Sequence, residues 1–223
     1  MIKDSLFETG LFNEALVPFI EMFYPEGPPN ALVDQDEVRS KNLLELKNSM
    51  NGWVEEMEQG IHYFQTHSPH ETQEKLKNFT EGDALVDVFE ALSSEVLIFS
   101  IPLNLSAEEM NSFYTQACEQ VDSDPQLAQK LFMALLFLNF TEARYWVGLA
   151  YCFVKQEHDE MARSVYEFGL LATVNDPMVP LYFAKYLILH GDPLAEDVIK
   201  EGMRRTTDEA TLEEFQKLSS SQP

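Results

Sequence analysis

The sequence predicts an all-α protein in which several N-terminal helices are followed by a three-repeat stack of helix-turn-helix units. The main observation is a spacing of 34 residues between three pairs of look-alike positions: Cys118 and Cys152, Ala128 and Ala162, and Phe132 and Tyr166. A small residue, a second small residue and an aromatic residue thus recur in the same order. The second observation is that apolar residues of the N-terminal half recur at helical spacing.

The 34-residue spacing is the period of the tetratricopeptide repeat, in which two antiparallel helices form a unit and successive units stack. The best-formed repeat begins near Glu142 and matches the usual pattern at Trp146, Leu149, Ala150, Phe153, Ala162, Tyr166 and Gly169. Two helices approach closely only where small residues face each other, so we expect Ala150 and Ala162 to mark their contact. Glu157 departs from the pattern because the turn usually has Gly there.

The repeats on either side are also recognisable. The preceding one starts at a capping box, Ser106 with Glu109, and its second helix matches better than its first, at Ala128, Phe132 and Leu135. The following repeat matches at Asp176, Pro177, Phe183, Ala184 and Gly191. We therefore expect three repeats over residues 106–207, and a frayed tail over residues 208–223.

Residues 1–105 are predicted to be a helical extension that serves either as a dimer interface or as a lid over the repeats. Helices are expected over about 36–66, 70–79 and 84–99, after a loop at 24–30 that contains three prolines. A first helix is expected before this loop, and its apolar stripe is too wide for a helix that faces water on one side. Within this stripe, the residues that we predict to form a dimer interface are Leu6, Phe12, Phe19 and Phe23.

The composition indicates a soluble, folded protein with few classes of partner. With 15 Lys and Arg against 38 Asp and Glu, the formal net charge is -23. Such a surface repels nucleic-acid phosphates and anionic lipids, and favours basic or neutral partners. No apolar run is long enough for a membrane span, and the N-terminal residues lack the features of a secretory signal. We therefore expect a cytoplasmic protein.

The sequence contains no recognisable site for catalysis, a metal or a cofactor. The two cysteines are too few for a disulfide framework, and both are expected to be buried as small apolar residues. His62, His67 and His70 do not share one helix face and have no completing ligands, so no metal site is predicted. Phosphate-binding, dinucleotide-binding and hydrolase motifs are absent from the sequence.

The repeats resemble a known family, the class II chaperones of bacterial type III secretion (the LcrH/SycD group), including its longer chlamydial-type members. The middle repeat carries the resemblance at Tyr145, Trp146, Val147, Gly148, Leu149, Ala150, Met161, Ala162, Tyr166, Phe168 and Gly169. The third repeat adds Asp176, Pro177, Pro180, Phe183, Ala184, His190 and Gly191. The similarity extends from about Ala84 to Arg205. Gln116 departs from it, where the family tends to have Ala.

The resemblance implies a non-enzymatic bacterial virulence chaperone that dimerises through its N-terminal helices. Such a chaperone holds a hydrophobic translocator or effector in the cytoplasm before export, with an extended segment of this client in the concave groove of the repeats. By repeat register, the groove residues are Phe113, Ala117, Gln120, Arg144, Val147, Tyr151, Val154, Met178, Leu181, Lys185 and Ile188. Tyr151 is the strongest candidate, because helix packing does not need an aromatic residue there. Arg144 and Lys185 either bind the client or form ordinary surface ion pairs.

Two other classes of function remain open. The protein could be a general tetratricopeptide adaptor for another secretion-apparatus or regulatory protein, although Arg144 and Lys185 alone make a poor clamp for a C-terminal carboxylate. An enzyme would need an active site in residues 1–105, where no His-acid or Cys-His pair is evident. A chaperone that binds a secreted protein is the favoured reading.

Overall fold

The computed structural model describes residues 56–81 and 103–220, and every regular element in these two ranges is a helix. The predicted all-α fold is therefore confirmed. The chain divides into two compact units, Met1–Glu109 and Met110–Pro223, which are described separately. Within the described ranges, no helix is both long and apolar enough to cross a membrane.

In the first unit, the structure describes a helix over 56–66 and helix α4 (His70–Glu81). Met57, Ile61 and Phe64 follow one another at helical spacing and are buried, as is Leu76 of α4. The helical spacing of these apolar residues predicts that they are buried, and their burial stabilises the two helices. The predicted helix over 84–99, the first helix with its apolar stripe, and the part of the long helix before residue 56 lie outside the described residues.

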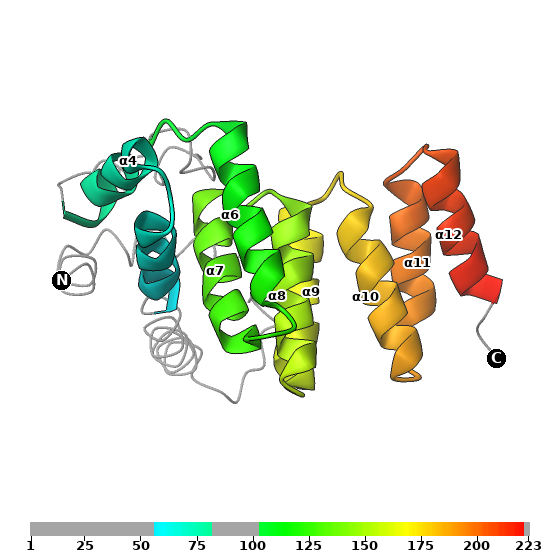
Figure 1. Ribbon diagram of the computed structural model, residues 1–223. Helices are drawn as coiled ribbons and strands as arrows, with labels where there is room; N and C mark the ends of the chain where they lie inside the picture. The colour runs from blue at the N-terminus through cyan, green and yellow to red at the C-terminus, as the bar shows by residue number, and fades with distance from the viewer. Residues whose placement is uncertain (1–55, 82–102, 221–223) are drawn as a thin grey trace, which may run out of the picture. The chain divides into compact units, whose positions relative to one another are not determined.

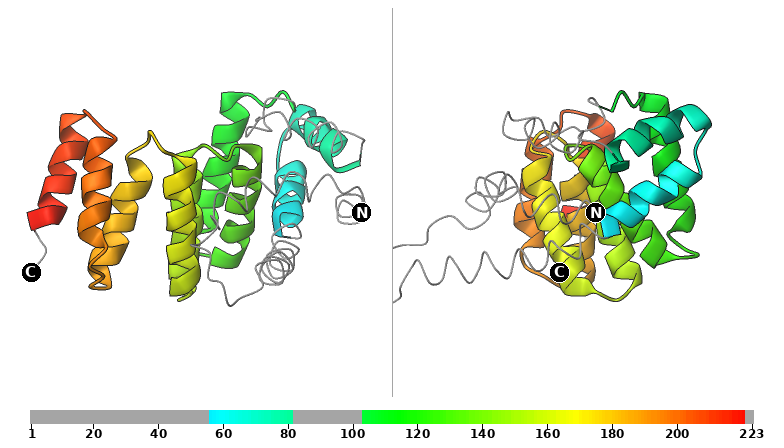
Figure 2. Two further views of the ribbon diagram at one scale, coloured as in Figure 1. Left: turned by 180° about the vertical axis from the view of Figure 1, so that it is seen from behind. Right: turned by 90° about the vertical axis from the view of Figure 1, so that its left-hand side faces the viewer.

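The second unit is a succession of antiparallel helices, which Figure 1 shows in order from green to red and Figure 2 shows from behind. They are α6 (Ala107–Gln120), whose first three residues belong to the first unit, α7 (Pro125–Leu138), α8 (Ala143–Lys155), α9 (Asp159–Ala172), α10 (Met178–Leu189), α11 (Ala195–Arg204) and α12 (Glu209–Ser220). From α7 onward each helix packs against the next, and α10 also packs against α8 and α12. The first helices of the second and third repeats, α8 and α10, therefore lie side by side.

Repeat 2, formed by α8 and α9, has the predicted core. Trp146, Leu149, Ala150 and Phe153 of α8 are buried, as are Ala162, Tyr166 and Gly169 of α9. Trp146 also donates its indole N–H to the carbonyl of Phe140 at 2.8 Å, so its polar atom is satisfied. Repeat 3 is formed by α10 and α11. It completely buries Phe183 and Ala184, which lie 34 residues after Leu149 and Ala150.

Repeat 1, formed by α6 and α7, differs from the sequence register in its first helix. The turn from Val121 to Asp124 is one residue longer than the turn from Gln156 to His158 in repeat 2. Consequently α6 matches α8 at a spacing of 33 residues: Phe113 is buried like Trp146, and Ala117 like Ala150. The prediction that both cysteines are buried is wrong for Cys118, which is exposed, and right for Cys152. The 34-residue pairing holds for α7, where Ala128, Phe132 and Leu135 are buried.

The C-terminal segment is helical, which corrects the prediction of a frayed tail over residues 208–223. Helix α12 buries Phe215 completely against α11. A Cβ atom on Gly202 would meet the Phe215 ring at 2.2 Å, so only glycine lets the ring lie this close to α11. The remaining residues of α12 are mostly polar, and this apparent lack of a core pattern explains why the sequence did not predict the packing.

Candidate peptide-binding face

The structure places the predicted groove residues in three environments. Tyr151 and Lys185 are exposed. Partly exposed are Gln120, Arg144, Val147, Val154, Met178 and Ile188. Buried are Phe113, Ala117 and Leu181. The first two groups offer surface to a partner, whereas the third contributes to the core.

Phe113 and Ala117 are corrections to the predicted site, and the longer turn of repeat 1 explains them. Because α6 is shifted by one position, the residue that corresponds to Tyr151 is Cys118 rather than Ala117. Tyr114 takes the position that corresponds to Val147, and it is partly exposed. Sequence reasoning missed Tyr114 and Cys118, although the poor match of the first helix of repeat 1 was a signal that its register could differ.

The corrected set defines what we call the first-helix face, which consists of the exposed and partly exposed side chains on one side of α6, α8 and α10. Its members are Tyr114, Cys118, Arg144, Val147, Tyr151, Val154, Lys155, Met178, Tyr182, Lys185 and Ile188. Tyr114 contacts α8 through the ring of Tyr145, with 5.9 Å between the centroids. Helices α8 and α10 pack directly. The face is therefore continuous across three repeats.

The surroundings of Tyr114 include residues of three helices of this face. Burial, then a hydrogen bond with Cys118, and also the nearby Tyr182 raise this pKa to about 12, while the charge of Arg144 acts in the opposite direction. Tyr114 thus interacts with residues of α6, α8 and α10. Tyr166, beneath the face, has its pKa raised mainly by burial, with contributions from Tyr151 and Tyr182 among others. A tyrosine hydroxyl can serve as both a hydrogen-bond donor and an acceptor.

Arg144 and Lys185, the two cations left open by the sequence, form ion pairs within the chain. Arg144 lies 2.9 Å from the Glu142 carboxylate, and Lys185 lies 3.0 Å from that of Glu214. Arg144 also donates to the side-chain oxygen of Asn111 at 3.5 Å. The ordinary ion pairs that the sequence allowed as an alternative are therefore present.

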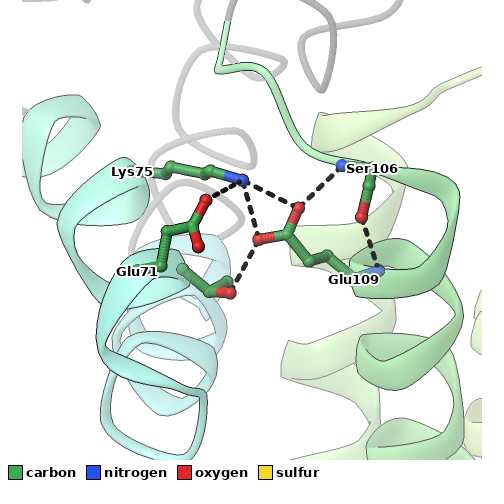
Figure 3. A network of polar contacts seen from close by, with 5 residues as sticks. Glu71, Lys75, Ser106 and Glu109 are labelled. Atoms are coloured by element: carbon green, nitrogen blue, oxygen red, sulfur yellow. Dashed lines mark hydrogen bonds and ion pairs between the residues drawn. The ribbon is translucent and has the colours of Figure 1, made fainter.

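A separate polar network in the first unit joins α4 to the start of α6, as Figure 3 shows. The Glu109 carboxylate accepts hydrogen bonds from Thr72 at 2.7 Å, Lys75 at 3.0 Å and the Ser106 backbone N–H at 2.8 Å. The Ser106 hydroxyl accepts from the Glu109 N–H at 3.2 Å, which completes the predicted capping box. Partial burial raises the pKa of Glu109, but the hydrogen bonds from Ser106, Thr72 and Lys75 outweigh this effect and lower it to about 2. The network is a structural clasp.

Other predicted features have simpler outcomes. Among the residues that the structure describes, no three His, Cys, Asp or Glu side chains are grouped as a metal site. The ring of His67 bonds to the Tyr63 carbonyl and to Thr66 at 2.9 Å. Burial raises the pKa of Cys152 to about 12, so its thiol is unreactive. The predicted dimer residues Leu6, Phe12, Phe19 and Phe23 lie outside the described residues.

Comparison with known proteins gives remote similarity to one group. No model of a known protein family matches the chain. The low calcium response locus protein H of Yersinia pestis is 25% identical over 133 residues, which are 59% of this chain and 71% of that protein. The protein of the same name from Yersinia pseudotuberculosis shows the same identity and coverage.

Solved structures of type III secretion proteins match part of this chain. A type III secretion complex from Aeromonas hydrophila covers 60% of this chain and 91% of its own, with a TM-score of 0.50 and 20% identity, which supports the fold. The translocator chaperone SycD of Yersinia enterocolitica covers 55% of this chain and 94% of its own, with a TM-score of 0.48 and 22% identity. Taken with the repeat motifs, the similarity to protein H shows that this chain resembles the class II chaperones of type III secretion.

Proposed function

We propose that this protein is a cytoplasmic type III secretion chaperone that binds an extended apolar segment of a translocator or effector protein on its first-helix face. Binding would keep that client soluble before export. The observation that carries the proposal is the exposure of two aromatic rings on neighbouring first helices, 44% for Tyr151 and 43% for Tyr182. Among the tyrosine, phenylalanine and tryptophan side chains whose burial the structure describes, no other is as exposed.

The physical reason is that exposed tyrosines are well suited to binding a partner. A tyrosine ring offers a large apolar area and a hydroxyl at little conformational cost, and tyrosine is therefore enriched at binding hot spots. Stacked repeats present their first helices along one surface, where an extended peptide can contact several units at once. A surface of this kind can bind an extended chain segment, which supports the chaperone proposal.

The test is co-expression of the full chain with a candidate hydrophobic translocator from the same genome, followed by purification of the soluble complex. We expect a stable complex with the wild-type protein and its loss with Tyr151→Glu, because a charge on the central helix would be buried under the client. Circular dichroism of the free variant establishes that it remains folded.

Leu171→Glu is the matched control. Leu171 is 51% exposed, so it resembles Tyr151 in accessibility, but it belongs to α9, a second helix. We expect this variant to retain the complex. Loss of the complex with Leu171→Glu but not with Tyr151→Glu would assign client binding to the second helices. A folded wild-type protein that captures no translocator would favour the adaptor function.

The dimer interface is a separate proposal. We infer from the width of the N-terminal apolar stripe that Leu6, Phe12, Phe19 and Phe23 pack against a second copy of the chain. Light scattering at micromolar concentration is expected to give the mass of a dimer. A monomer under these conditions would contradict the inference.

A further inference from the structure

The Glu109 carboxylate divides its two oxygens between two helices. Its Oε1 atom accepts hydrogen bonds from the Thr72 hydroxyl at 2.7 Å and from Lys75 at 3.0 Å, both on α4. Its Oε2 atom accepts from the Ser106 backbone N–H at 2.8 Å, which belongs to the cap of α6. Lys75 also reaches Oε2 at 3.0 Å and so bridges the two oxygens, as Figure 3 shows. One side chain therefore serves both helices at once.

These contacts are largely shielded from water. Thr72 is 3% exposed, and the side chains of Lys75 and Glu109 are 20% and 17% exposed. Hydrogen bonds to a charged group are stronger than those between neutral groups, and a buried hydroxyl that loses its acceptor is costly. The attachment of α4 therefore depends on the position of one carboxylate.

The cap of α6 needs the same orientation of the Glu109 side chain. In the capping box, the Ser106 hydroxyl accepts from the Glu109 N–H at 3.2 Å, while the carboxylate turns back to the Ser106 N–H. This orientation directs Oε1 toward Thr72. If α4 moved away, the carboxylate would lose the positive charge of Lys75, and if the cap opened, the carboxylate would no longer be held beside Thr72. Each contact thus keeps the carboxylate where the other requires it.

We propose that Glu109 couples the attachment of α4 to the first turn of α6, so that the two are held together or released together. A partner that draws α4 away would then also loosen the start of α6. Coupling of this kind is reciprocal, so an event that orders the first turn of α6 would tighten the attachment of α4. Both α4 and Glu109 belong to the first unit, and the inference does not depend on the proposed function.

The test is amide hydrogen exchange of the full-length protein, measured by mass spectrometry of the peptides that cover residues 70–81 and 103–112. Thr72→Val keeps the shape of the side chain and removes the hydroxyl. It is expected to speed exchange at the start of α6 about five- to tenfold, the effect of one hydrogen bond. Ser106→Ala removes a bond within the cap and is expected to speed exchange in α4 by a similar factor. Circular dichroism establishes that both variants remain folded.

Two control variants separate the coupling from a general loss of stability. Asp124→Ala removes an equivalent cap at the start of α7 and is expected to leave exchange in α4 unchanged. Glu71→Gln acts on α4, where Glu71 lies 3.7 Å from Lys75 but has a side chain that is 87% exposed, so the start of α6 is expected to be unaffected. If Asp124→Ala sped exchange in α4 as much as Ser106→Ala does, the inference would be overturned.

The coupling must act in both directions and through Glu109 itself. Unchanged exchange at the start of α6 in Thr72→Val, or unchanged exchange in α4 in Ser106→Ala, would each overturn the inference. In a chain that already carries Glu109→Ala, the substitution Ser106→Ala is expected to have no further effect on α4. An undiminished effect there would show that another contact joins the two helices. These outcomes are measured without a client and leave the proposed function untouched.

Discussion

In repeat 1 both helices begin with side-chain caps, whereas in repeat 2 neither helix does. The capping box of Ser106 and Glu109 starts α6, and the Asp124 carboxylate accepts a hydrogen bond from the Leu127 N–H at the start of α7. By contrast, the residues that precede α8 and α9 make no side-chain cap. Repeat 2 has the stronger apolar motif. The comparison teaches that the helices of repeat 1 have local start signals in addition to buried apolar residues, whereas those of repeat 2 depend on packing without such signals.

The largest expected effect tests the shifted register of α6. Phe113→Ala is expected to lower the free energy of unfolding by about 3–5 kcal/mol, because it removes a large side chain that is only 1% exposed. Ser112→Ala, at the position that the 34-residue spacing would equate with Trp146, is expected to change it by less than about 0.5 kcal/mol. Urea denaturation followed by circular dichroism measures both. A large effect of Ser112→Ala would restore the original register.

The next effect concerns the clasp at the start of α6. Glu109→Gln is expected to cost about 2 kcal/mol, because it removes charged hydrogen bonds to Thr72, Lys75 and the Ser106 N–H. The folded-state pKa is lowered from 4.5 to about 2, so this stabilisation is present above about pH 4.5 and is lost as the pH falls toward 2. Denaturation across that pH range measures it. Glu108→Gln, in the same helical turn, is the control and should show no comparable loss.

A smaller effect is expected from the cap of α7. Asp124→Ala should lower the free energy of unfolding by about 1 kcal/mol, since it leaves the Leu127 N–H without its side-chain acceptor. His158→Ala, at the matching position before α9, removes no capping bond and should change stability by less than about 0.5 kcal/mol. Equal losses in thermal denaturation would show that the two repeats do not differ in their dependence on caps.

The smallest expected effect comes from a substitution that relieves backbone strain in the turn of repeat 2. Glu157 has a φ of 59°, in the left-handed region that favours glycine, and Gly191 occupies the same place in repeat 3 with a φ of 64°. Glu157→Gly is expected to raise the melting temperature, with a gain of about 0.5–1 kcal/mol. Gly191→Ala is the converse variant and should lower it. A decrease with Glu157→Gly would mean that the side chain stabilises the turn by more than its backbone strain costs.

The sequence predicted repeat 2 almost completely, because small and aromatic residues at that spacing are typical of the tetratricopeptide repeat and of few other structures. It predicted the α6 cap from Ser106 and Glu109, and Tyr151 as an exposed member of the candidate face. It did not predict the longer turn of repeat 1, since one added residue leaves the α7 pattern intact and shifts only α6. Nor did it predict α12, whose packing depends on Phe215 meeting a glycine in another helix. Such pairings are properties of tertiary contact rather than of local pattern.

The one-residue lengthening of the first turn has a practical consequence. By turning α6, it brings the Cys118 thiol to the surface beside Tyr114, while the thiol of Cys152 remains buried. A thiol-reactive fluorophore should therefore attach to the unmodified protein at a single position within the first-helix face. The natural sequence thus provides its own attachment point for an optical reporter, with which arrival and departure of a client can be followed in real time without engineering the chain.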